Sequence, residues 1–264
     1  MQLGDRMKLF EGIESDRILL PGVPILARLD GKAFHTLTRG LERPFCKGLH
    51  DLMQDVTRKL VDVSGAVMGY TQSDEITLVF SPYTPAEDRW FGGRVQKLTS
   101  LLASYASVEF NARTAEHGLT FNQPGLFDCR VWSVPNKAEA VNCLIWREQD
   151  ATKNSINSVA QSLFSHKSLQ GLDGNQLQEK MWQERQVNWN DYPAWSKRGS
   201  YIRRSRVERP FTVLELESLP PQHNAHKNPN LLVSRVVIER MDMPILSTVE
   251  NCEAVVFDGA EPCQ

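Results

Sequence analysis

Short strand-like stretches alternate with longer helix-like stretches in the first half of the chain, and their order limits the folds that it can adopt. The strand-like stretches are rich in apolar strand formers, whereas the helix-like stretches repeat apolar residues every three or four positions. The expected strands cover residues 25–29, 66–70, 76–80 and 127–134, and the expected helices cover 46–63 and 90–105. This order, strand, helix, strand, strand, helix, strand, is typical of the ferredoxin-like α+β fold.

The two middle strands are expected to form an antiparallel hairpin. Only a short polar link, Thr71-Gln72-Ser73-Asp74-Glu75, separates them, and two strands with so short a link favour this arrangement. In the ferredoxin-like order the first strand lies beside this hairpin. The end of the first strand, at Asp30, is therefore expected to lie close to the hairpin link.

Residues 136–264 have a different pattern from residues 1–135. Residues 138–164 are mostly helical in apolar spacing, and Gln-rich stretches, further tryptophans and a basic run follow. We expect a mostly helical C-terminal lobe, with one further strand over residues 233–239. The two parts are expected to form one compact unit.

Composition excludes several broad classes of protein. The chain has 264 residues, 41% hydrophobic and 23% charged, which does not fit a disordered, collagen-like or coiled-coil chain. No apolar run reaches the roughly 18 residues needed to span a bilayer, and the N-terminus lacks a signal-peptide core. The five cysteines form no CxxC pair, so we expect a reduced cytoplasmic protein without a membrane segment.

Three carboxylates stand where the predicted sheet brings the first strand and the hairpin together. Asp30 ends the first strand, and Asp74 and Glu75 lie in the hairpin link. Clustered carboxylates repel one another unless a cation lies between them, and hard oxygen ligands beside phosphates suit Mg²⁺. Two such ions can activate an attacking oxygen and stabilise a leaving one in phosphoryl transfer.

The neighbours of these carboxylates suit a nucleotide. Gly31 allows a phosphate to approach the backbone closely, and Ser73 adds a hydroxyl. Lys32 and His35 can donate hydrogen bonds to phosphate oxygens. Each segment alone is also an ordinary solvated turn, because Asp-Gly and Ser-Asp-Glu are common in turns. On these residues alone, a metal and nucleotide site and a pair of polar turns both stay open.

Two motifs carry a family resemblance. Residues 27–35 read Ala-Arg-Leu-Asp-Gly-Lys-Ala-Phe-His, and residues 69–75 read Gly-Tyr-Thr-Gln-Ser-Asp-Glu. In this order they resemble the R-[IL]-D-G-[RK]-x-F-H and Y-x-Q-S-D-E motifs of the tRNA-His guanylyltransferase superfamily. The opening residues 4–8 resemble its guanylyltransferase-like branch, which includes bacterial members, and the likeness extends into the basic run 197–206.

The resemblance implies a polymerase-like palm that works in the 3′-to-5′ direction. Members of the superfamily activate the 5′ end of tRNA by adenylylation or use a 5′-triphosphate, and the 3′-hydroxyl of an incoming nucleotide then attacks. ATP and GTP are therefore expected as substrates beside tRNA. Carried over by motif, the Asp30 and Asp74 side chains and the Gly31 carbonyl would bind two Mg²⁺ ions, with Glu75 as a third catalytic carboxylate.

The resemblance also implies residues for nucleotide and tRNA. The triphosphate would be wrapped by Lys32, Ala33, Phe34, His35 and Ser73, and a second nucleotide or triphosphate would meet Arg94, Lys97 and Arg130. The net charge of −2 makes RNA binding depend on a local patch, which the basic run provides, although an ordinary solvated face would have the same composition. The implied tRNA contacts are Lys197, Arg198, Arg203, Arg204, Arg206 and Asn154. Because the superfamily passes tRNA across subunits, a homotetramer or a dimer is expected.

The chain departs from the guanylyltransferases proper at three places. Where they carry His-Ile-Asn-Asn after Trp-Arg-Gln-x-Asp-x, this chain has Thr152-Lys153-Asn154-Ser155 and keeps one Asn. An Asp common near the nucleobase is replaced in the sequence Arg43-Pro44-Phe45-Cys46, and Cys129 replaces a Gly in a Phe-Asp-Gly-Arg motif. The first departure favours template-directed 5′-end repair over obligate G addition to tRNA-His, and the second weakens a preference for guanine.

Two other functions fit the same carboxylates. A nucleotide cyclase would share the palm but would need no RNA, which leaves the basic run without a purpose. A non-catalytic RNA-binding protein would keep the palm as a scaffold, which the complete set of Asp30, Asp74 and Glu75 disfavours.

Overall fold

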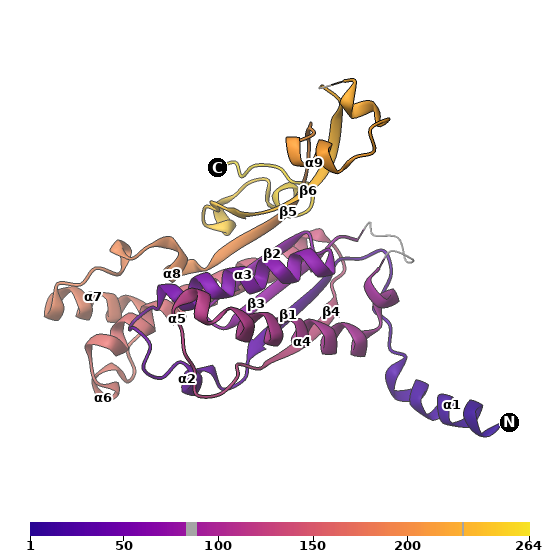
Figure 1. Ribbon diagram of the computed structural model, residues 1–264. Coiled ribbons are helices and arrows are strands. Elements are labelled where there is room, and N and C mark those ends of the chain that lie inside the picture. Colours follow the sequence, from indigo (N-terminus) through magenta and orange to yellow (C-terminus); the bar gives the residue numbers. More distant parts are fainter. Residues whose placement is uncertain (83–88, 229) are drawn as a thin grey trace.

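A six-stranded antiparallel sheet organises the computed structural model, which describes residues 1–82, 89–228 and 230–264 (Figure 1). The strand order is β4-β1-β3-β2-β5-β6. The strands are β1 (Ile25–Gly31), β2 (Met68–Gln72), β3 (Glu75–Phe80), β4 (Phe127–Ser133), β5 (Ser200–Pro210) and β6 (Leu232–Met241). Strands from both halves of the chain therefore share one sheet.

The first four strands and two helices form the predicted ferredoxin-like unit. Helix α3 (Lys47–Ser64) connects β1 to β2, and α4 (Val95–Arg113) connects β3 to β4. Both helices lie on one face of the sheet, and β2 and β3 form the predicted hairpin (Figure 1). The prediction of an α+β fold is confirmed.

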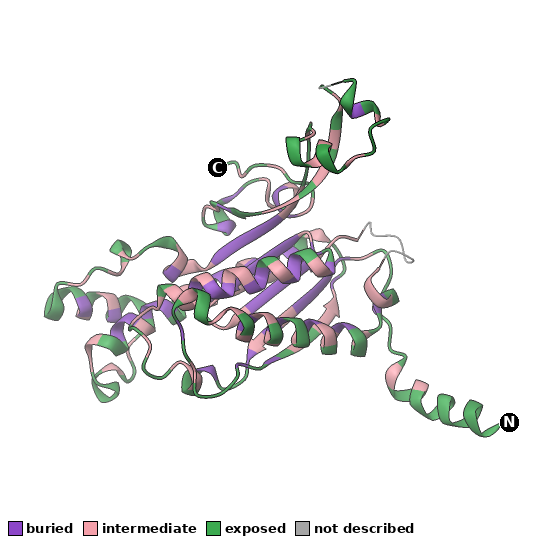
Figure 2. Ribbon diagram, viewed as in Figure 1, coloured by how far each residue is buried: buried purple, intermediate pink, exposed green. Residues whose placement is uncertain are grey.

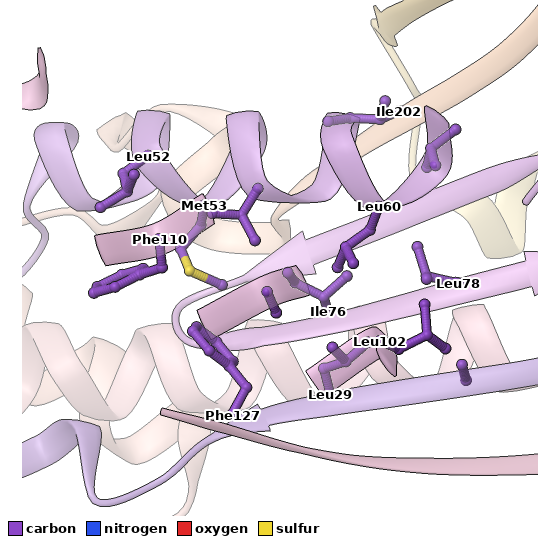
Figure 3. Packing of buried hydrophobic residues seen from close by; sticks show 14 of the residues in the cluster. Leu29, Leu52, Met53, Leu60, Ile76, Leu78, Leu102, Phe110, Phe127 and Ile202 are labelled. Carbon is purple, nitrogen blue, oxygen red and sulfur yellow. The ribbon is translucent and has the colours of Figure 1, made fainter. Parts of the chain in front are cut away.

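Helices α3 and α4 pack against one face of the sheet. Helix α3 turns Leu52, Met53 and Leu60 toward Ile76 and Leu78 on β3, and all five side chains are buried (Figure 3). The helical spacing of its apolar residues gives α3 this single buried side. Gly65 ends the helix in the left-handed conformation, with φ of 74°.

The opposite face is covered by α5 (Lys137–Leu163), which begins at Asn136, whose side chain accepts a hydrogen bond from the Glu139 N–H. Leu144 of α5 packs in one buried cluster with Leu26 and Tyr70 of the sheet. The helices expected after α5 are present as α6 (His166–Leu169), α7 (Gly174–Arg185) and α8 (Ala194–Arg198). Helix α7 buries Leu177 and Met181 in a cluster that includes the end of α5.

The basic run is where the helical prediction is wrong. Gly199, with φ of 78°, ends α8, and the following residues form β5 instead of helix. A Cβ on Gly199 would lie 2.5 Å from the Thr71 carbonyl oxygen, so only glycine allows this close approach to β2. β5 pairs with β2 over Ser200–Arg203 and with β6 over Tyr201–Pro210, which supplies the hydrogen bonds that favour a strand. The predicted strand over 233–239 is confirmed as β6.

Four further α-helices complete the described part of the chain. They are α1 (Leu3–Ser15), α2 (Phe34–Leu37), α9 (Val213–Ser218) and α10 (Cys252–Phe257). Two of them, α2 and α10, contribute buried residues to the core. Helix α1 projects from the body and buries no residue, as Figure 2 shows. Within the described ranges, no helix is both long and apolar enough to cross a membrane.

Phe110 of α4 anchors the segment after β1. Its ring centroid lies 5.2 Å from that of Phe34 and 5.6 Å from that of Phe127. Because Phe110 is fully buried, we expect Phe110→Ala to lower the free energy of unfolding by about 3–5 kcal/mol in chemical denaturation. On the same helix, Val108→Ala is the control, since Val108 is 68% exposed and its loss should cost under about 0.5 kcal/mol. Equal losses would contradict this assignment.

Candidate active site

Strand pairing brings the three predicted carboxylates together. Asp30 at the end of β1 stands directly opposite Glu75 at the start of β3. The Gly31 N–H donates to the Asp74 carbonyl oxygen at 3.1 Å, which ties β1 to the hairpin link. Ser73 has a left-handed backbone, with φ of 54°, and so turns the chain sharply just before Asp74.

Asp30 and Asp74 line one cavity of about 650 Å³. The other predicted residues that line it are Gly31, Ala33, Phe34, His35 and Ser73. Lys32 does not line this cavity, because its side chain lies in a separate hollow of about 490 Å³ beside Asp128 and α4. Of the predicted residues 30–35, 73 and 74, all except Lys32 therefore line the same cavity.

The turn after β1 has its own geometric cause. A Cβ on Gly31 would lie 2.3 Å from the Phe34 ring, so glycine is required for Phe34 to fold back into the core. The Lys32 N–H donates to the Leu126 carbonyl oxygen at 2.8 Å, and Ala33 is left-handed with φ of 55°. Helix α2 begins at Phe34, and a helix leaves its first N–H groups without partners inside the helix. Backbone donors are thus presented beside the cavity.

The charges of Asp74 and Asp30 suit a cation. Burial raises the pKa of Asp74, and the neighbouring Asp30 carboxylate raises it further, while the Ser73 hydroxyl, which donates at 3.0 Å, lowers it. Two carboxylates and a carbonyl are the donor set that Mg²⁺ takes together with substrate phosphates. Within the described ranges, no group of three or more His, Cys, Asp or Glu side chains forms a metal site by itself. The residues present therefore fit ions that are held jointly with a nucleotide.

Glu75 is engaged by Arg147 of α5. The Arg147 Nε and NH2 groups donate to the two Glu75 carboxylate oxygens at 2.6 and 2.7 Å, and NH2 also donates to Asp150 at 2.9 Å. Burial raises the pKa of Glu75 even though Arg147 lowers it. Sequence reasoning missed this ion pair because its partners lie far apart along the chain.

Part of the cavity lining is aromatic, and of its residues only Phe45 belongs to a segment that the family resemblance placed near the nucleobase. Phe45, His50 and Trp195 line the cavity, and the His50 and Trp195 rings stack with centroids 4.5 Å apart. Burial lowers the pKa of His50 to about 4, so its ring is neutral at physiological pH. Its Nε2 lies 3.3 Å from the Ser200 hydroxyl. No local pattern could have joined Trp195 to Phe45 and His50, because it lies about 150 positions further along the chain.

The predicted basic residues for a second phosphate do not line the cavity. Arg94 and Lys97 are exposed at the start of α4, where Lys97 lies over the Phe91 ring. Arg130 is exposed on β4, directly opposite Arg28 of β1, and its guanidinium lies 3.6 Å from the Asp128 carboxylate. Arg130 is thus two residues along β4 from the position opposite Asp30, which is Asp128.

The predicted tRNA contacts divide into two groups. Arg203 is turned inward: it is 8% exposed, and its guanidinium binds Glu239 at 3.0 Å and Glu261 at 2.8 Å. The other predicted residues reach the surface wholly or in part, and they are Asn154, Lys197, Arg198, Arg204 and Arg206. The structure therefore does not present Arg203 to RNA.

Comparisons with known proteins place the chain in a family. The sequence profile of the family described as tRNAHis guanylyltransferase matches residues 4–135, half of the chain. A "Probable tRNA(His) guanylyltransferase" of Drosophila melanogaster is 28% identical over 215 residues, which are 76% of this chain and 74% of that protein.

Solved structures agree with the sequence profile. A "Bacterial tRNA(HIS) Guanylyltransferase (Thg1)-Like Protein in complex with ATP" has a TM-score of 0.77 and 33% identity, covering 97% of this chain and 99% of its own. The corresponding structure in complex with GTP has a TM-score of 0.69 and 32% identity, covering 93% and 94%. The chain therefore belongs to the tRNAHis guanylyltransferase family, whose members are nucleotidyltransferases.

Proposed function

We propose that the protein is an Mg²⁺-dependent nucleotidyltransferase that extends the 5′ end of tRNA by template-directed addition. The observation that carries this proposal is the placement of Asp30 and Asp74 on the wall of one cavity of about 650 Å³. A cavity of this size holds a small ligand such as a nucleotide. Family membership, and the ATP and GTP complexes of the bacterial relatives, support the same activity.

In this proposal Asp30, Asp74 and the Gly31 carbonyl hold two Mg²⁺ ions. Bound ions of this kind supply Lewis-acid stabilisation of the charge that develops on transferring phosphates. Ser73, by donating to the Asp74 carboxylate, keeps that side chain oriented toward the cavity wall. The Gly31 N–H, bound to the Asp74 carbonyl, holds both segments at a constant spacing.

The remaining cavity residues bind the nucleotide. His35 and the backbone N–H groups of Ala33 and Phe34 donate to the triphosphate, which lies beside the carboxylates. The base extends toward Phe45 and Trp195, where an aromatic surface allows stacking. The Asp that the family resemblance implies near the nucleobase is absent from residues 43–46, although Glu42 lines the same cavity, so we expect a weakened preference for guanine, which fits addition of whichever base the template specifies.

The RNA substrate is proposed to approach along exposed basic residues. Lys32 and Arg130 lie at the β4 side of the carboxylates, and Arg94 and Lys97 lie further along α4. Lys197, Arg198, Arg204, Arg206 and Asn154 supply the contacts on the other side. Phosphate contacts of this kind position RNA without reading its sequence.

An extension assay tests the proposed function. Two tRNAs are used, a tRNA-His that lacks its extra G and a second tRNA that lacks its first nucleotide, each with Mg²⁺ and each single nucleoside triphosphate. We expect extension only where the added base pairs with the opposing strand, and none when EDTA removes the metal.

Other products would separate the alternatives. Addition of G to tRNA-His regardless of the opposing base would replace templated repair with guanylyltransferase activity. A nucleotide product formed without RNA would indicate a cyclase, and RNA binding with no product of any kind would indicate a scaffold.

Asp74→Asn is expected to lower activity and raise stability together. Extension should fall at least about a hundredfold, because this carboxylate is assigned to the metals. Its pKa is raised in the folded protein, so at neutral pH the buried charge destabilises the fold, an effect that disappears as pH falls through that raised pKa. The metal-free variant should therefore show a Tm about 2–4 °C higher at pH 7 in calorimetry. A lower Tm would contradict the assigned burial cost.

We also propose a homo-oligomer, and helix α1 supports it. The helix buries no residue, yet Leu3, Met7, Phe10 and Ile13 form an exposed apolar stripe. A helix of 13 residues is marginal in water without a packing partner.

Light scattering after size-exclusion chromatography tests this oligomer. The native chain should be larger than a monomer, and Phe10→Glu should weaken its association at least about tenfold. Glu11→Gln, on the polar side of the same helix, should leave the oligomer unchanged. A monomeric native chain would reject the proposal.

A further inference from the structure

We propose that Arg147 is a positioning residue that holds Glu75 away from the metal ions, so that Asp30 and Asp74 are the only carboxylates of this trio that bind metal. The inference rests on the metal site of the proposed function. It changes the role of Glu75, which the motif resemblance placed among the catalytic carboxylates.

The register of β1 and β3 brings like charges together, and Arg147 compensates one of them. Asp30 and Glu75 are directly opposite each other on neighbouring antiparallel strands, so their side chains emerge on the same face of the sheet. Like charges directly opposite each other are destabilising. Asp74 directly precedes Glu75 in the chain, so three carboxylates meet at one end of the β2–β3 hairpin.

Both carboxylate oxygens of Glu75 are engaged by Arg147. These oxygens accept hydrogen bonds from one guanidinium, at 2.6 and 2.7 Å, in a bidentate geometry. Glu75 is absent from the residues that line the cavity, whereas Asp30 and Asp74 both line it. The Glu75 side chain is 17% exposed and the Arg147 side chain 13% exposed, so water competes weakly for this pair.

Arg147 is itself held rigidly from α5. Its NH2 group binds Asp150 one turn later at 2.9 Å, and its guanidinium lies 4.5 Å from the centre of the Trp146 ring. Arg28 of β1 lies over the same ring at 5.5 Å. The helix on the far face of the sheet therefore fixes where the Glu75 carboxylate can go.

The arrangement sets the charge that faces a nucleotide. With Glu75 paired, two carboxylate charges meet the metals and the triphosphate instead of three. A third free carboxylate would bind divalent cations more tightly and repel the triphosphate. Arg147 thus keeps the site dependent on the nucleotide to complete the coordination of the metals.

The test measures Mn²⁺ affinity by electron paramagnetic resonance, on the full chain without nucleotide or RNA. Five proteins are compared, the native chain, Glu75→Gln, Asp74→Asn, Arg147→Met and the double variant Glu75→Gln with Arg147→Met. Met keeps much of the length of Arg and removes its charge. Thermal unfolding checks that each protein is folded.

Opposite shifts are expected from the two partners of one ion pair. Glu75→Gln should weaken Mn²⁺ binding slightly, by less than about threefold, because it leaves the Arg147 charge unpaired, whereas Asp74→Asn should weaken it at least about tenfold. Arg147→Met should tighten Mn²⁺ binding about tenfold by releasing Glu75, and the double variant should return to the native value. A residue with only a structural role would not tighten metal binding when removed.

Each contrary result has a distinct meaning. If Glu75→Gln weakens Mn²⁺ binding as much as Asp74→Asn does, Glu75 is a ligand and the inference is overturned. If Arg147→Met is folded but binds no more tightly than the native chain, the inference is also overturned. If Asp74→Asn leaves affinity unchanged, the metal site of the proposed function fails together with it. Should Arg147→Met not fold, the comparison of Glu75→Gln with Asp74→Asn decides alone.

Discussion

Antiparallel pairing of β1 with β3 determines where the candidate catalytic groups lie. The register sets Asp30 opposite Glu75, and one further hydrogen bond, from the Gly31 N–H to the Asp74 carbonyl, brings in the third carboxylate. A shift of one residue in this register would turn Asp30 toward α3 and α4. The buried clusters on both faces prevent such a shift, because it would also move residues such as Leu29 out of the cluster in which they pack. The packing of the sheet and the geometry of the site therefore have a common cause.

The same register concentrates negative charge in a partly buried place. Burial raises the pKa values of both Asp74 and Glu75, so each is ionised at a cost to the stability of the fold. The fold offsets the two charges differently. Arg147 neutralises Glu75 within the protein, whereas the Asp74 carboxylate has no such ion pair, is hydrogen-bonded by the Ser73 hydroxyl, and would gain most from a bound cation. The charge of Asp74 therefore destabilises the fold in the absence of a cation, whereas the charge of Glu75 is offset in part by Arg147.

Locally periodic elements could be predicted from the sequence, and elements defined by distant partners could not. The helix at 47–64 and the hairpin around Ser73 carry their own apolar pattern and turn residues, so their positions followed directly. β5 was missed because its charged residues look solvated until β2 and β6 pair on either side. The ion pair between Arg147 and Glu75 joins residues 72 positions apart, and the stacking of His50 on Trp195 is equally non-local. The acidic part of the site was therefore predictable, whereas the stacked pair of His50 and Trp195 was not.

Because strands from both halves of the chain form one sheet, the N-terminal half does not contain the whole site. The half of the chain that matches the family profile contains every candidate metal ligand, but the cavity wall also needs Ser158, Trp195 and Ser196. Cutting the chain after residue 135 would remove those side chains and would also strip β5 from β2, leaving β2 with a row of unpaired backbone groups. An exposed strand edge of this kind can pair with the strands of other chains and lead to aggregation. The family motifs of this protein lie within residues 4–135, whereas the sheet and the cavity wall on which the site depends include residues beyond 135.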